Sequence, residues 1–298
     1  MNFSEIILAL HGDAGREWWS ALPAILDACA ERWDLILAPP PFENLSYNYV
    51  LPVHRVNGMP AVLKVGFAND ELRAEMAALR HFDGRGMVRL LDADEENCAM
   101  LLEQILPGET LWRVEDEIAT EHLLTVMPRL WKPYRGNYPF KTVADWGRGF
   151  ARLRERYNGK TGKLDAKMVD KAEHLFYELL ASSAEPVLLH GDLHHDNLLS
   201  AQRAPYLAID PKGVLGEPAY EVGAFLRNPL PSLLEKGNPR KLTERRVDMI
   251  VECLGFDRQR IISWGFAQAV LSAIWCDEDG VDCGDEVMLV AEILTRLQ

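Results

Sequence analysis

The sequence predicts an α+β protein with a small N-terminal lobe built on an antiparallel sheet and a larger, mainly helical C-terminal lobe. Short runs rich in β-branched and aromatic residues dominate between residues 35 and 105, whereas helical periodicity dominates beyond residue 108. The tripeptide Leu106-Pro107-Gly108 separates the two patterns, where a linker is expected. A chain of 298 residues is long enough for two lobes, which we place at 1–106 and 107–298.

The N-terminal lobe is expected to begin with a helix at Asp13–Arg32, where apolar residues recur at helical spacing and Asp13 is a suitable N-cap. Strands are expected at LILAP, SYNYVLPVHR and PAVLKVGF, with Asn57-Gly58 as the hairpin turn between the last two. A helix at Asn69–His81 carries Leu72, Met76 and Leu79 on one face. The strand candidates MVRLLDAD and CAMLLEQI complete the lobe.

In the C-terminal lobe, helices are expected at 119–131, 142–157 and 165–182. The short strand PVLL follows, then LLSA and YLAI as a hairpin, and helices resume after Pro218. The longest uncharged run, Ile261–Cys276, falls short of the roughly 18 residues that a membrane-spanning helix needs. We interpret it as a buried helix.

Composition excludes several classes of partner and setting. The chain has 45 acidic and 32 basic side chains, a formal charge of −13, which disfavours nucleic acid and suits a cationic or neutral partner. The five cysteines are odd in number and show no CxxC spacing, so neither a disulfide framework nor a zinc site is indicated. The N-terminus, with Glu5 in its apolar stretch, does not resemble a secretory signal. We therefore expect a cytoplasmic protein without a membrane partner.

The octet HGDLHHDN at 190–197, followed by the aspartate of AIDPKG, contains the parts that phosphoryl transfer requires. Asp192 can accept a hydrogen bond from an attacking hydroxyl, while Asn197 and Asp210 can supply oxygen ligands for Mg²⁺ bound to nucleotide phosphates. Asp, Asn and Gly are also common turn formers, so a solvated loop is the alternative for any one of them. For all of them at this spacing, we favour a small-molecule kinase.

Lys64 lies inside the apolar strand AVLKVGF, where an unpaired charge is costly to bury. Glu75 on the following helix is the expected partner, with Glu71 one turn earlier as the rival. Such a pair can hold the ammonium group over nucleotide phosphates. The alternative is an edge-strand lysine that points into water.

These motifs resemble the aminoglycoside and hydroxyurea phosphotransferase family, the streptomycin kinase branch of the protein-kinase-like fold, from about Leu35 to about Phe225. HGDLHHDN resembles its catalytic loop, DPKG its metal-binding turn, GEPAYE the segment after that turn, and FENLSYNYV with VLK its N-terminal lobe. The resemblance implies an antibiotic-resistance kinase that uses ATP and Mg²⁺.

Carried over residue by residue, the resemblance makes Asp192 the catalytic base and Lys64 with Glu75 the phosphate-orienting pair. Asn197 and Asp210 match the metal ligands, and the backbone of Glu103, Gln104 and Ile105 matches the segment that holds adenine. Protein kinases cover the phosphates with a GxGxxG loop, but this chain has Glu43-Asn44-Leu45-Ser46, in which Ser46 can offer a hydroxyl. DPK replaces DFG, so regulation by loop phosphorylation is not predicted.

Two other classes of protein fit parts of the same pattern. The residues His190, Asp192, His194, His195 and Asp196 could form a hydrolytic zinc cluster, but no histidine follows His195 to complete a dinuclear site. We instead interpret His190 as a residue that braces the loop by a hydrogen bond to backbone. A nucleotide-binding module without catalysis would have no need for a base at Asp192.

The acceptor is the least determined part of the prediction. Asp196, Glu217 and Glu221 are the residues expected to contact it, and carboxylates there would attract guanidinium or ammonium groups. The acidic stretch 277–286 could contribute, although a solvated turn is the simpler interpretation. Streptomycin, another aminoglycoside, hydroxyurea, and a metabolic sugar or amino alcohol all remain possible acceptors. The oligomeric state and the choice between ATP and GTP also stay open.

Overall fold

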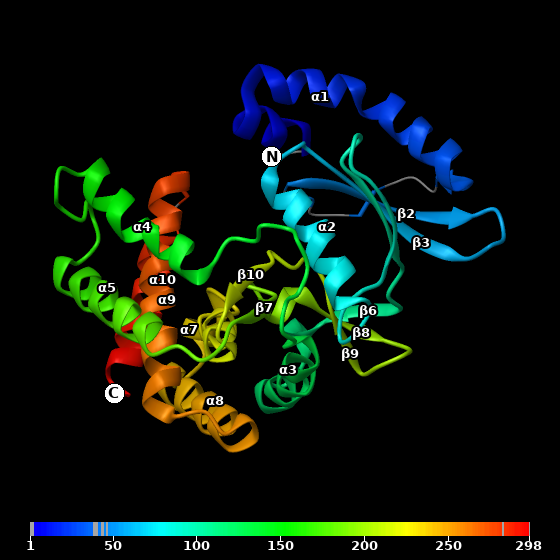
Figure 1. The fold of residues 1–298 in the computed structure, drawn as a ribbon. Coiled ribbons are helices and arrows are strands. Elements are labelled where there is room, and N and C mark those ends of the chain that lie inside the picture. The colour runs from blue at the N-terminus through cyan, green and yellow to red at the C-terminus, as the bar shows by residue number, and fades with distance from the viewer. Residues whose placement is uncertain (1–2, 38–40, 43–44, 46, 282, 298) are drawn as a thin grey trace. The chain divides into compact units, whose positions relative to one another are not determined.

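The computed structural model describes residues 3–37, 41–42, 45, 47–281 and 283–297 (Figure 1). The chain divides into two units, Met1–Leu106 and Pro107–Gln298. An antiparallel sheet organises the first unit and helices dominate the second, so the expected α+β fold is confirmed. Within the described ranges, no helix is both long and apolar enough to cross a membrane.

The first unit is built on a five-stranded sheet with the order β1-β2-β3-β5-β4, in which every neighbouring pair is antiparallel. Its strands are β1 (Leu35–Leu37), β2 (Asn48–Arg55), β3 (Pro60–Gly66), β4 (Leu90–Asp94) and β5 (Ala99–Glu103). The predicted hairpin is confirmed, because Gly58 has a φ of 81° and the Asn57 side chain accepts the backbone N–H of Met59. The strand expected from Met87 is shorter than predicted and begins at Leu90.

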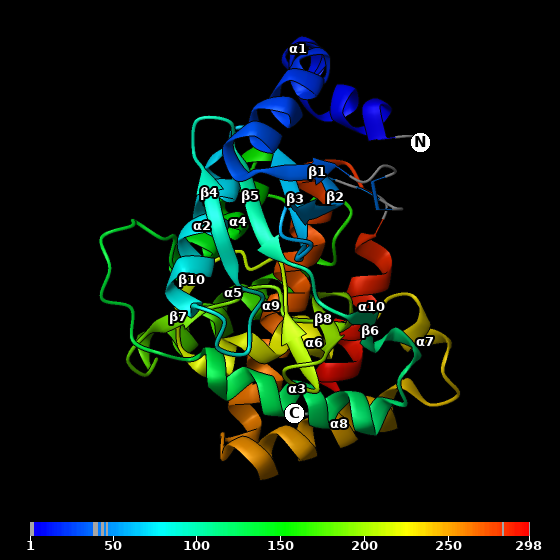
Figure 2. The same cartoon turned by 90° about the vertical axis from the view of Figure 1, so that its right-hand side faces the viewer.

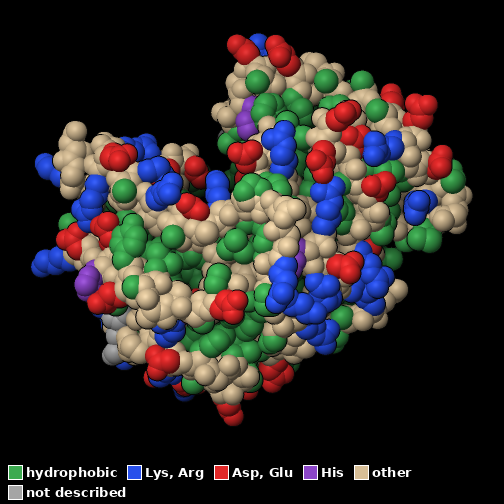
Figure 3. Space-filling model, in the orientation of Figure 1, with side chains coloured by type: hydrophobic (Ala, Val, Ile, Leu, Met, Phe, Trp, Pro, Cys, Tyr) green, Lys and Arg blue, Asp and Glu red, His purple; other side chains and the backbone are tan. Residues whose placement is uncertain are grey.

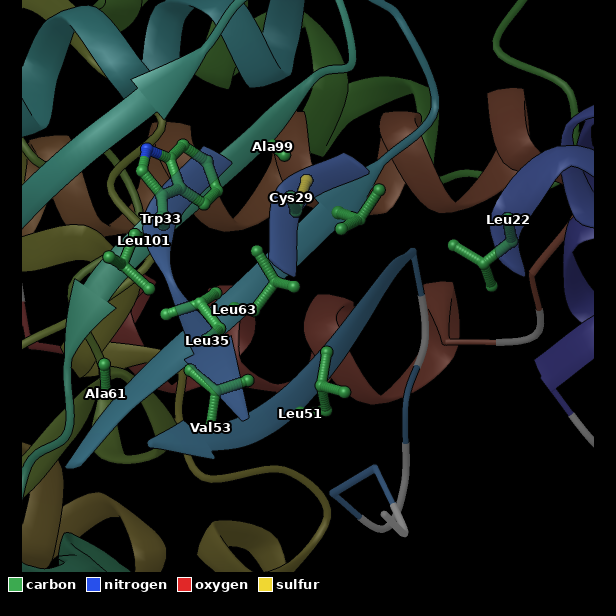
Figure 4. Close-up of a cluster of buried hydrophobic side chains, with 11 residues drawn as sticks. Leu22, Cys29, Trp33, Leu35, Leu51, Val53, Ala61, Leu63, Ala99 and Leu101 are labelled. Atoms are coloured by element: carbon green, nitrogen blue, oxygen red, sulfur yellow. The ribbon is translucent and has the colours of Figure 1, made fainter. Parts of the chain in front are cut away.

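Helices cover both faces of this sheet. Residues Ala61, Leu63 and Val65 alternate along β3 and pack into one buried cluster with side chains of α1 (Phe3–Trp33), as Figure 4 shows. The opposite face of β3 carries Lys64, which meets α2 (Asp70–Phe82). Figure 2 shows the same strands and helices from a second side.

Helix α1 is longer than the sequence indicates. The predicted helix starts just after Gly12, whose φ of 56° and ψ of −132° interrupt the helical backbone, but the residues before Gly12 are helical as well. Helix α2 starts where it was expected, because the side chain of Asn69 accepts the backbone N–H of Leu72. The short link between β3 and α2 thereby fixes which face of α2 meets the sheet.

The second unit contains two small sheets among helices. Strands β6 (Pro107–Thr110), β8 (Leu198–Ala201) and β9 (Tyr206–Ala208) form one sheet, and β7 (Val187–Leu189) pairs with β10 (Val214–Gly216) in the other. The predicted β8–β9 hairpin is confirmed. Residues 106–108 were expected to be a linker, but Pro107 begins strand β6, which pairs with β8. Strand β10, which pairs with β7, was not predicted.

The helices of the second unit follow the predicted pattern closely. The long ones are α3 (Asp116–Leu130), α4 (Val143–Arg156), α5 (Ala166–Ala181), α8 (Pro239–Leu254), α9 (Arg258–Asp279) and α10 (Gly284–Thr295). Shorter turns are η1 (Leu111–Arg113), η2 (His195–Asn197), η3 (Pro218–Glu221), α6 (Val222–Leu226) and α7 (Ser232–Glu235). The predicted buried helix is confirmed as α9, which is buried along most of its length.

A disulfide joins Cys276, near the end of α9, to Cys283, which precedes α10. The cysteine spacing indicated no disulfide framework, and this single disulfide was not predicted. The helix ends with Gly280 in the left-handed conformation, and the two bonded sulfur atoms lie on either side of this turn. A single local crosslink leaves no framework pattern in the sequence.

Charged side chains of both signs are interspersed on the face of the molecule shown in Figure 3. Some charged side chains form ion pairs between neighbouring helices, such as Arg154 of α4 with Asp170 and Glu173 of α5. The net charge of −13 therefore does not form one acidic patch on that face.

Candidate active site

Lys64 and Glu75 form a buried ion pair in the first unit. The Lys64 Nζ lies 2.7 Å from Oε1 and 2.9 Å from Oε2 of Glu75, and the lysine is only 3% exposed. Strand β3 is central, flanked by β2 and β5, so the edge-strand alternative for this lysine is wrong. The rival Glu71 lies on the exposed side of α2. Both charges are thus held in a fixed, largely dehydrated geometry.

His190 braces the loop that follows β7, as predicted. Its Nε2–H donates to the Ile209 carbonyl at 2.7 Å, and its Nδ1 accepts the backbone N–H of Asp192 at 3.2 Å. Burial lowers the pKa of His190 to about 4, so the ring stays neutral at pH 7. With both ring nitrogens engaged within the protein, His190 is a structural residue of the loop rather than a metal ligand.

Glu221 anchors the same loop from η3. Its carboxylate accepts the backbone N–H groups of His190 and Gly191 at 2.7 and 2.8 Å. Burial raises the pKa of Glu221 to about 7 despite these two hydrogen bonds. Gly191 has a φ of 87°, and an added Cβ there would lie 2.7 Å from the Trp146 ring, so the turn requires glycine.

Asp192 lies on this braced loop with its side chain 28% exposed. Its Oδ1 is 3.2 Å from Arg227 Nη2, and its Oδ2 is 3.6 Å from His194 Nε2. Burial favours the neutral acid, but the interaction with His194 and the charges of Arg227 and Lys212 prevail and hold the pKa of Asp192 below its ordinary value. The side chain is therefore an accessible carboxylate at neutral pH.

Asn197 and Asp210 are brought together by the β8–β9 hairpin. The ladder pairs Leu198 with Ala208, and one step further the Asn197 carbonyl accepts the backbone N–H of Ile209 at 3.0 Å. Asp210 is the next residue, exposed and in the left-handed conformation with a φ of 56°. The Asn197 amide nitrogen donates to the Asp192 carbonyl at 2.8 Å, which fixes the orientation of its amide oxygen.

The zinc interpretation finds no support in this geometry. The His195 ring stacks on Phe225, with centroids 4.5 Å apart, and burial lowers its pKa. Among the described residues, no group of three or more His, Cys, Asp or Glu side chains is arranged to hold a metal. A pair of one Asn and one Asp does not belong to such groups, since Mg²⁺ in proteins is often held by one or two side chains together with phosphate oxygens and water.

The carboxylates expected to contact the acceptor lie in different environments. Asp196 is exposed beside His194. Glu217 is 5% exposed and bound by Arg260, whose Nε is 2.8 Å away, and by the indole N–H of Trp264. Like Glu221, Glu217 accepts hydrogen bonds from groups of the protein itself, so its placement disfavours direct contact with an acceptor.

The residues expected to hold adenine lie at the end of β5. Glu103 is the last residue of that strand, and Gln104 and Ile105 follow it without belonging to a strand. Ser46 lies outside the described residues, as do Glu43 and Asn44. In the acidic stretch 277–286, Asp277 accepts the hydroxyl of Tyr157 and Glu278 pairs with Arg152, so these two carboxylates are occupied.

Sequence reasoning missed three polar residues of the second unit. Arg227 contacts Asp192, and Gln268 of α9 contacts Arg227. Arg246 is fully buried and pairs with Asp116 at 2.5 Å. The signal that identified Lys64 was available for Arg227 too, since an arginine directly after the apolar run Ala224–Leu226 needs a partner when it is buried.

Comparison with solved structures defines the fold class. A crystal structure of the aminoglycoside phosphotransferase APH(4)-Ia superposes with a TM-score of 0.64 at 16% identity, covering 92% of this chain and 97% of that one. This likeness shows the fold, which is the protein-kinase-like fold that the sequence predicted.

Sequence comparison defines the family. The family described as aminoglycoside/hydroxyurea antibiotic resistance kinase matches residues 32–280. A streptomycin 6-kinase of Streptomyces glaucescens is 32% identical over 90% of this chain and 87% of its own length. A hydroxyurea phosphotransferase of Kitasatospora aureofaciens is 32% identical over 97% and 84%, respectively. The chain belongs to this family of small-molecule phosphotransferases, as its motifs predicted.

Proposed function

We propose that this protein transfers the γ-phosphoryl group of ATP to a hydroxyl of a streptomycin-like aminoglycoside or of a hydroxyurea-like molecule. The observation that carries the proposal is the loop from His190 to Asn197, in which an ionised, accessible Asp192 is held next to the Asn197–Asp210 pair. The two relatives named above act on acceptors of these two types. The need for ATP supports a cytoplasmic site of action.

In this proposal, Asp192 accepts the hydrogen bond of the acceptor hydroxyl and directs its oxygen toward the γ-phosphorus atom. A carboxylate whose pKa is held low by the interaction with His194 and by the charges of Arg227 and Lys212 is a weak base, so its main contribution is orientation. Proton transfer to it becomes favourable only as the new P–O bond forms and the hydroxyl becomes acidic. Glu221 and His190 contribute by fixing the loop backbone that carries Asp192.

The amide oxygen of Asn197 and the carboxylate of Asp210 fit Mg²⁺, because both are hard oxygen donors from adjacent positions of one hairpin. When bound, Mg²⁺ supplies positive charge to the oxygens of the β- and γ-phosphates. Asp210 is exposed, and the Asn197 amide is oriented by its bond to the Asp192 carbonyl. These two residues therefore link the metal site to the position of the proposed base.

The first unit is proposed to bind the nucleotide. Lys64, held by Glu75, would contact phosphate oxygens, since a positioned ammonium compensates their charge. The backbone groups of Gln104 and Ile105, which follow β5 outside the ladder, would hydrogen-bond the adenine edge together with Glu103. We propose this division of roles for the two units, with acceptor binding assigned to residues 107–298.

Asp196 is the carboxylate that we propose contacts the acceptor. Its side chain is 51% exposed and it lies four residues after Asp192 on the same loop. Guanidinium and ammonium groups are abundant in aminoglycosides, and a carboxylate beside the reacting hydroxyl would attract them. Glu217 and Glu221 would affect acceptor binding only indirectly. Glu221 fixes the backbone of His190 and Gly191, and Glu217 binds Arg260 and Trp264 of α9.

The test is an ADP-release assay with ATP and Mg²⁺ against streptomycin, other aminoglycosides, hydroxyurea, choline and simple sugars. Product mass spectrometry should show the addition of one phosphoryl group, and Asp192→Asn should abolish it. Asp170→Asn, which changes an exposed carboxylate on α5, is the matched control and should retain activity. ADP release that is independent of every acceptor, or that survives Asp192→Asn, would contradict the proposal.

A further inference from the structure

We propose that Arg227 and Gln268 form a positioning pair that sets the orientation of the Asp192 carboxylate for phosphoryl transfer. The inference rests on the proposed function, in which Asp192 receives the hydroxyl of the acceptor. Neither residue lies in the catalytic loop or the metal-binding turn. Arg227 is the C-cap residue directly after α6, and Gln268 lies in the middle of α9.

Arg227 contacts Asp192 through one oxygen. Its Nη2 donates to Oδ1 at 3.2 Å, and its other terminal nitrogen, Nη1, donates to Gln268 Oε1 at 2.5 Å. A guanidinium group that bound the Asp192 carboxylate in a bidentate manner would donate to both of its oxygens. The observed arrangement leaves Oδ2 on the side of His194, as the oxygen that can accept a hydrogen bond from a substrate.

Gln268 determines which way the guanidinium points. It is 2% exposed, and its Nε2 donates to the backbone carbonyl of Tyr220 at 3.2 Å. That bond fixes the amide orientation, so Oε1 must face Arg227. Gly223 makes the close packing possible, because a Cβ at that position would lie 2.3 Å from Gln268 Oε1.

Arg246 fixes the backbone on both sides of Arg227. Its Nη1 donates to the carbonyls of Phe225 and Asn228 at 3.0 and 2.6 Å, while its remaining nitrogens pair with Asp116. The base of the Arg227 side chain is thereby fixed by α8, and its tip by Gln268 of α9. A side chain held at both ends loses little further entropy when it orients Asp192.

The experiment compares kcat and KM of the wild type with those of Arg227→Met, Arg227→Lys, Gln268→Met and the double methionine variant. Misplacing a catalytic group by about 1 Å can cost about 100-fold in rate, so we expect a loss of that order in kcat for Arg227→Met. We expect about tenfold for Gln268→Met and an intermediate loss for Arg227→Lys. The KM for ATP should stay within about twofold of the wild type.

Coupling between the two residues distinguishes positioning from general packing. If Gln268 acts through Arg227, Gln268→Met should have little further effect on kcat when Arg227 is already methionine. Arg154→Met removes an arginine from a comparable ion-pair cluster between α4 and α5 and should leave kcat unchanged. Crystal structures of the single variants should show the Asp192 carboxylate rotated.

Additive losses in the double variant, or an unmoved Asp192 with kcat within twofold of the wild type, would overturn the inference. If the wild type phosphorylates no acceptor, the proposed function fails instead. The position of Asp192 in the Gln268→Met crystals would still decide whether Gln268 controls it. Thermal unfolding of each variant checks that the fold is retained.

Discussion

The Lys64–Glu75 pair and the loop around Asp192 hold their charges in different ways. In the first unit, both members of the pair are nearly buried and lie 11 positions apart, on a strand and the next helix. In the second unit, Asp192 stays 28% exposed. Its partner Arg227 lies 35 positions further along the chain, and Glu221, which anchors the loop, lies 30 positions after Gly191. The Lys64–Glu75 pair is thus shielded from water, whereas the Asp192 carboxylate stays partly accessible.

The difference shows what each site contributes. A buried ion pair loses solvation on both sides, and its net contribution to stability is small even when its geometry is good. Its value lies in holding an ammonium at one position. The Asp192 loop is instead fixed through its backbone by Glu221, and the Asp192 carboxylate contacts Arg227 through Oδ1, so its charge remains available to a ligand.

The largest effect is expected at Asp192. Replacing it with alanine removes the only group that we propose to orient the hydroxyl, so kcat should fall on the order of 10³-fold. Nucleotide binding should be nearly unchanged, as measured by titration with a non-hydrolysable ATP analogue. Asp210→Ala should do the reverse and weaken Mg²⁺-dependent nucleotide binding. Retention of most activity in Asp192→Ala would show that the role is assigned to the wrong residue.

The Lys64–Glu75 pair should give the next largest effect, and a double variant separates stability from activity. Lys64→Met removes the ammonium group that faces the buried Glu75 carboxylate, which should cost about 3 kcal/mol of unfolding free energy and about 100-fold in kcat/KM. Lys64→Met/Glu75→Met should recover most of the stability but none of the activity. Chemical denaturation and steady-state kinetics measure the two quantities.

A surface pair provides the control for that comparison. Arg80 and Glu95 are 2.9 Å apart on the same unit, with half-exposed side chains. Arg80→Met should change neither the unfolding free energy nor kcat/KM beyond experimental error, because exposed ion pairs contribute little. Recovery of activity in the Lys64/Glu75 double variant would contradict a role for Lys64 in phosphate binding.

Glu221 should produce a pH-dependent effect on stability. Because the folded-state pKa of about 7 lies above the ordinary 4.5, its contribution is complete below pH 4.5 and is lost as the pH rises through 7. Relative to Glu221→Gln, the wild type should lose on the order of 3 kcal/mol of unfolding free energy across this range. His190 titrates in both proteins, so its contribution cancels in the difference. Parallel stability curves would contradict the raised pKa.

The smallest effect on activity is expected from the disulfide. Replacing Cys276 and Cys283 together with serine removes a crosslink between residues seven positions apart, which should cost about 2 kcal/mol of stability. The value of kcat should stay within about twofold, since the crosslink contacts neither Asp192 nor its partners. Calorimetry and the same assay measure these outcomes. A large loss of activity would connect the α9–α10 turn to the acceptor.

Much of the fold could be predicted from local patterns. The β2–β3 hairpin followed from Asn57-Gly58, and α2 from the cap at Asn69 and its apolar stripe. The buried helix α9 followed from its uncharged run. The pairing of Lys64 with Glu75 was predictable because a buried lysine needs a partner, and the next helix is the nearest element that offers one.

The failures have a common physical reason. Strands β6 and β10 have four and three residues, and what makes them strands is pairing with β8 and β7 far away in the sequence. The internal roles of Glu217 and Glu221 depend in the same way on residues brought close by the fold, such as Arg260 and the backbone of Gly191. The sequence shows where a carboxylate lies in the chain, but it does not show which donor group the fold brings within hydrogen-bond distance of that carboxylate.

The β8–β9 hairpin has a consequence for how the family can vary in length. Asn197 and Asp210 stand at its open end, while residues 202–205 form its tip. Additional residues at the tip would extend into solvent and leave the open end unchanged. One extra residue within either strand would shift the register and turn alternate side chains to the other face. Natural insertions between these two residues should therefore accumulate at the tip.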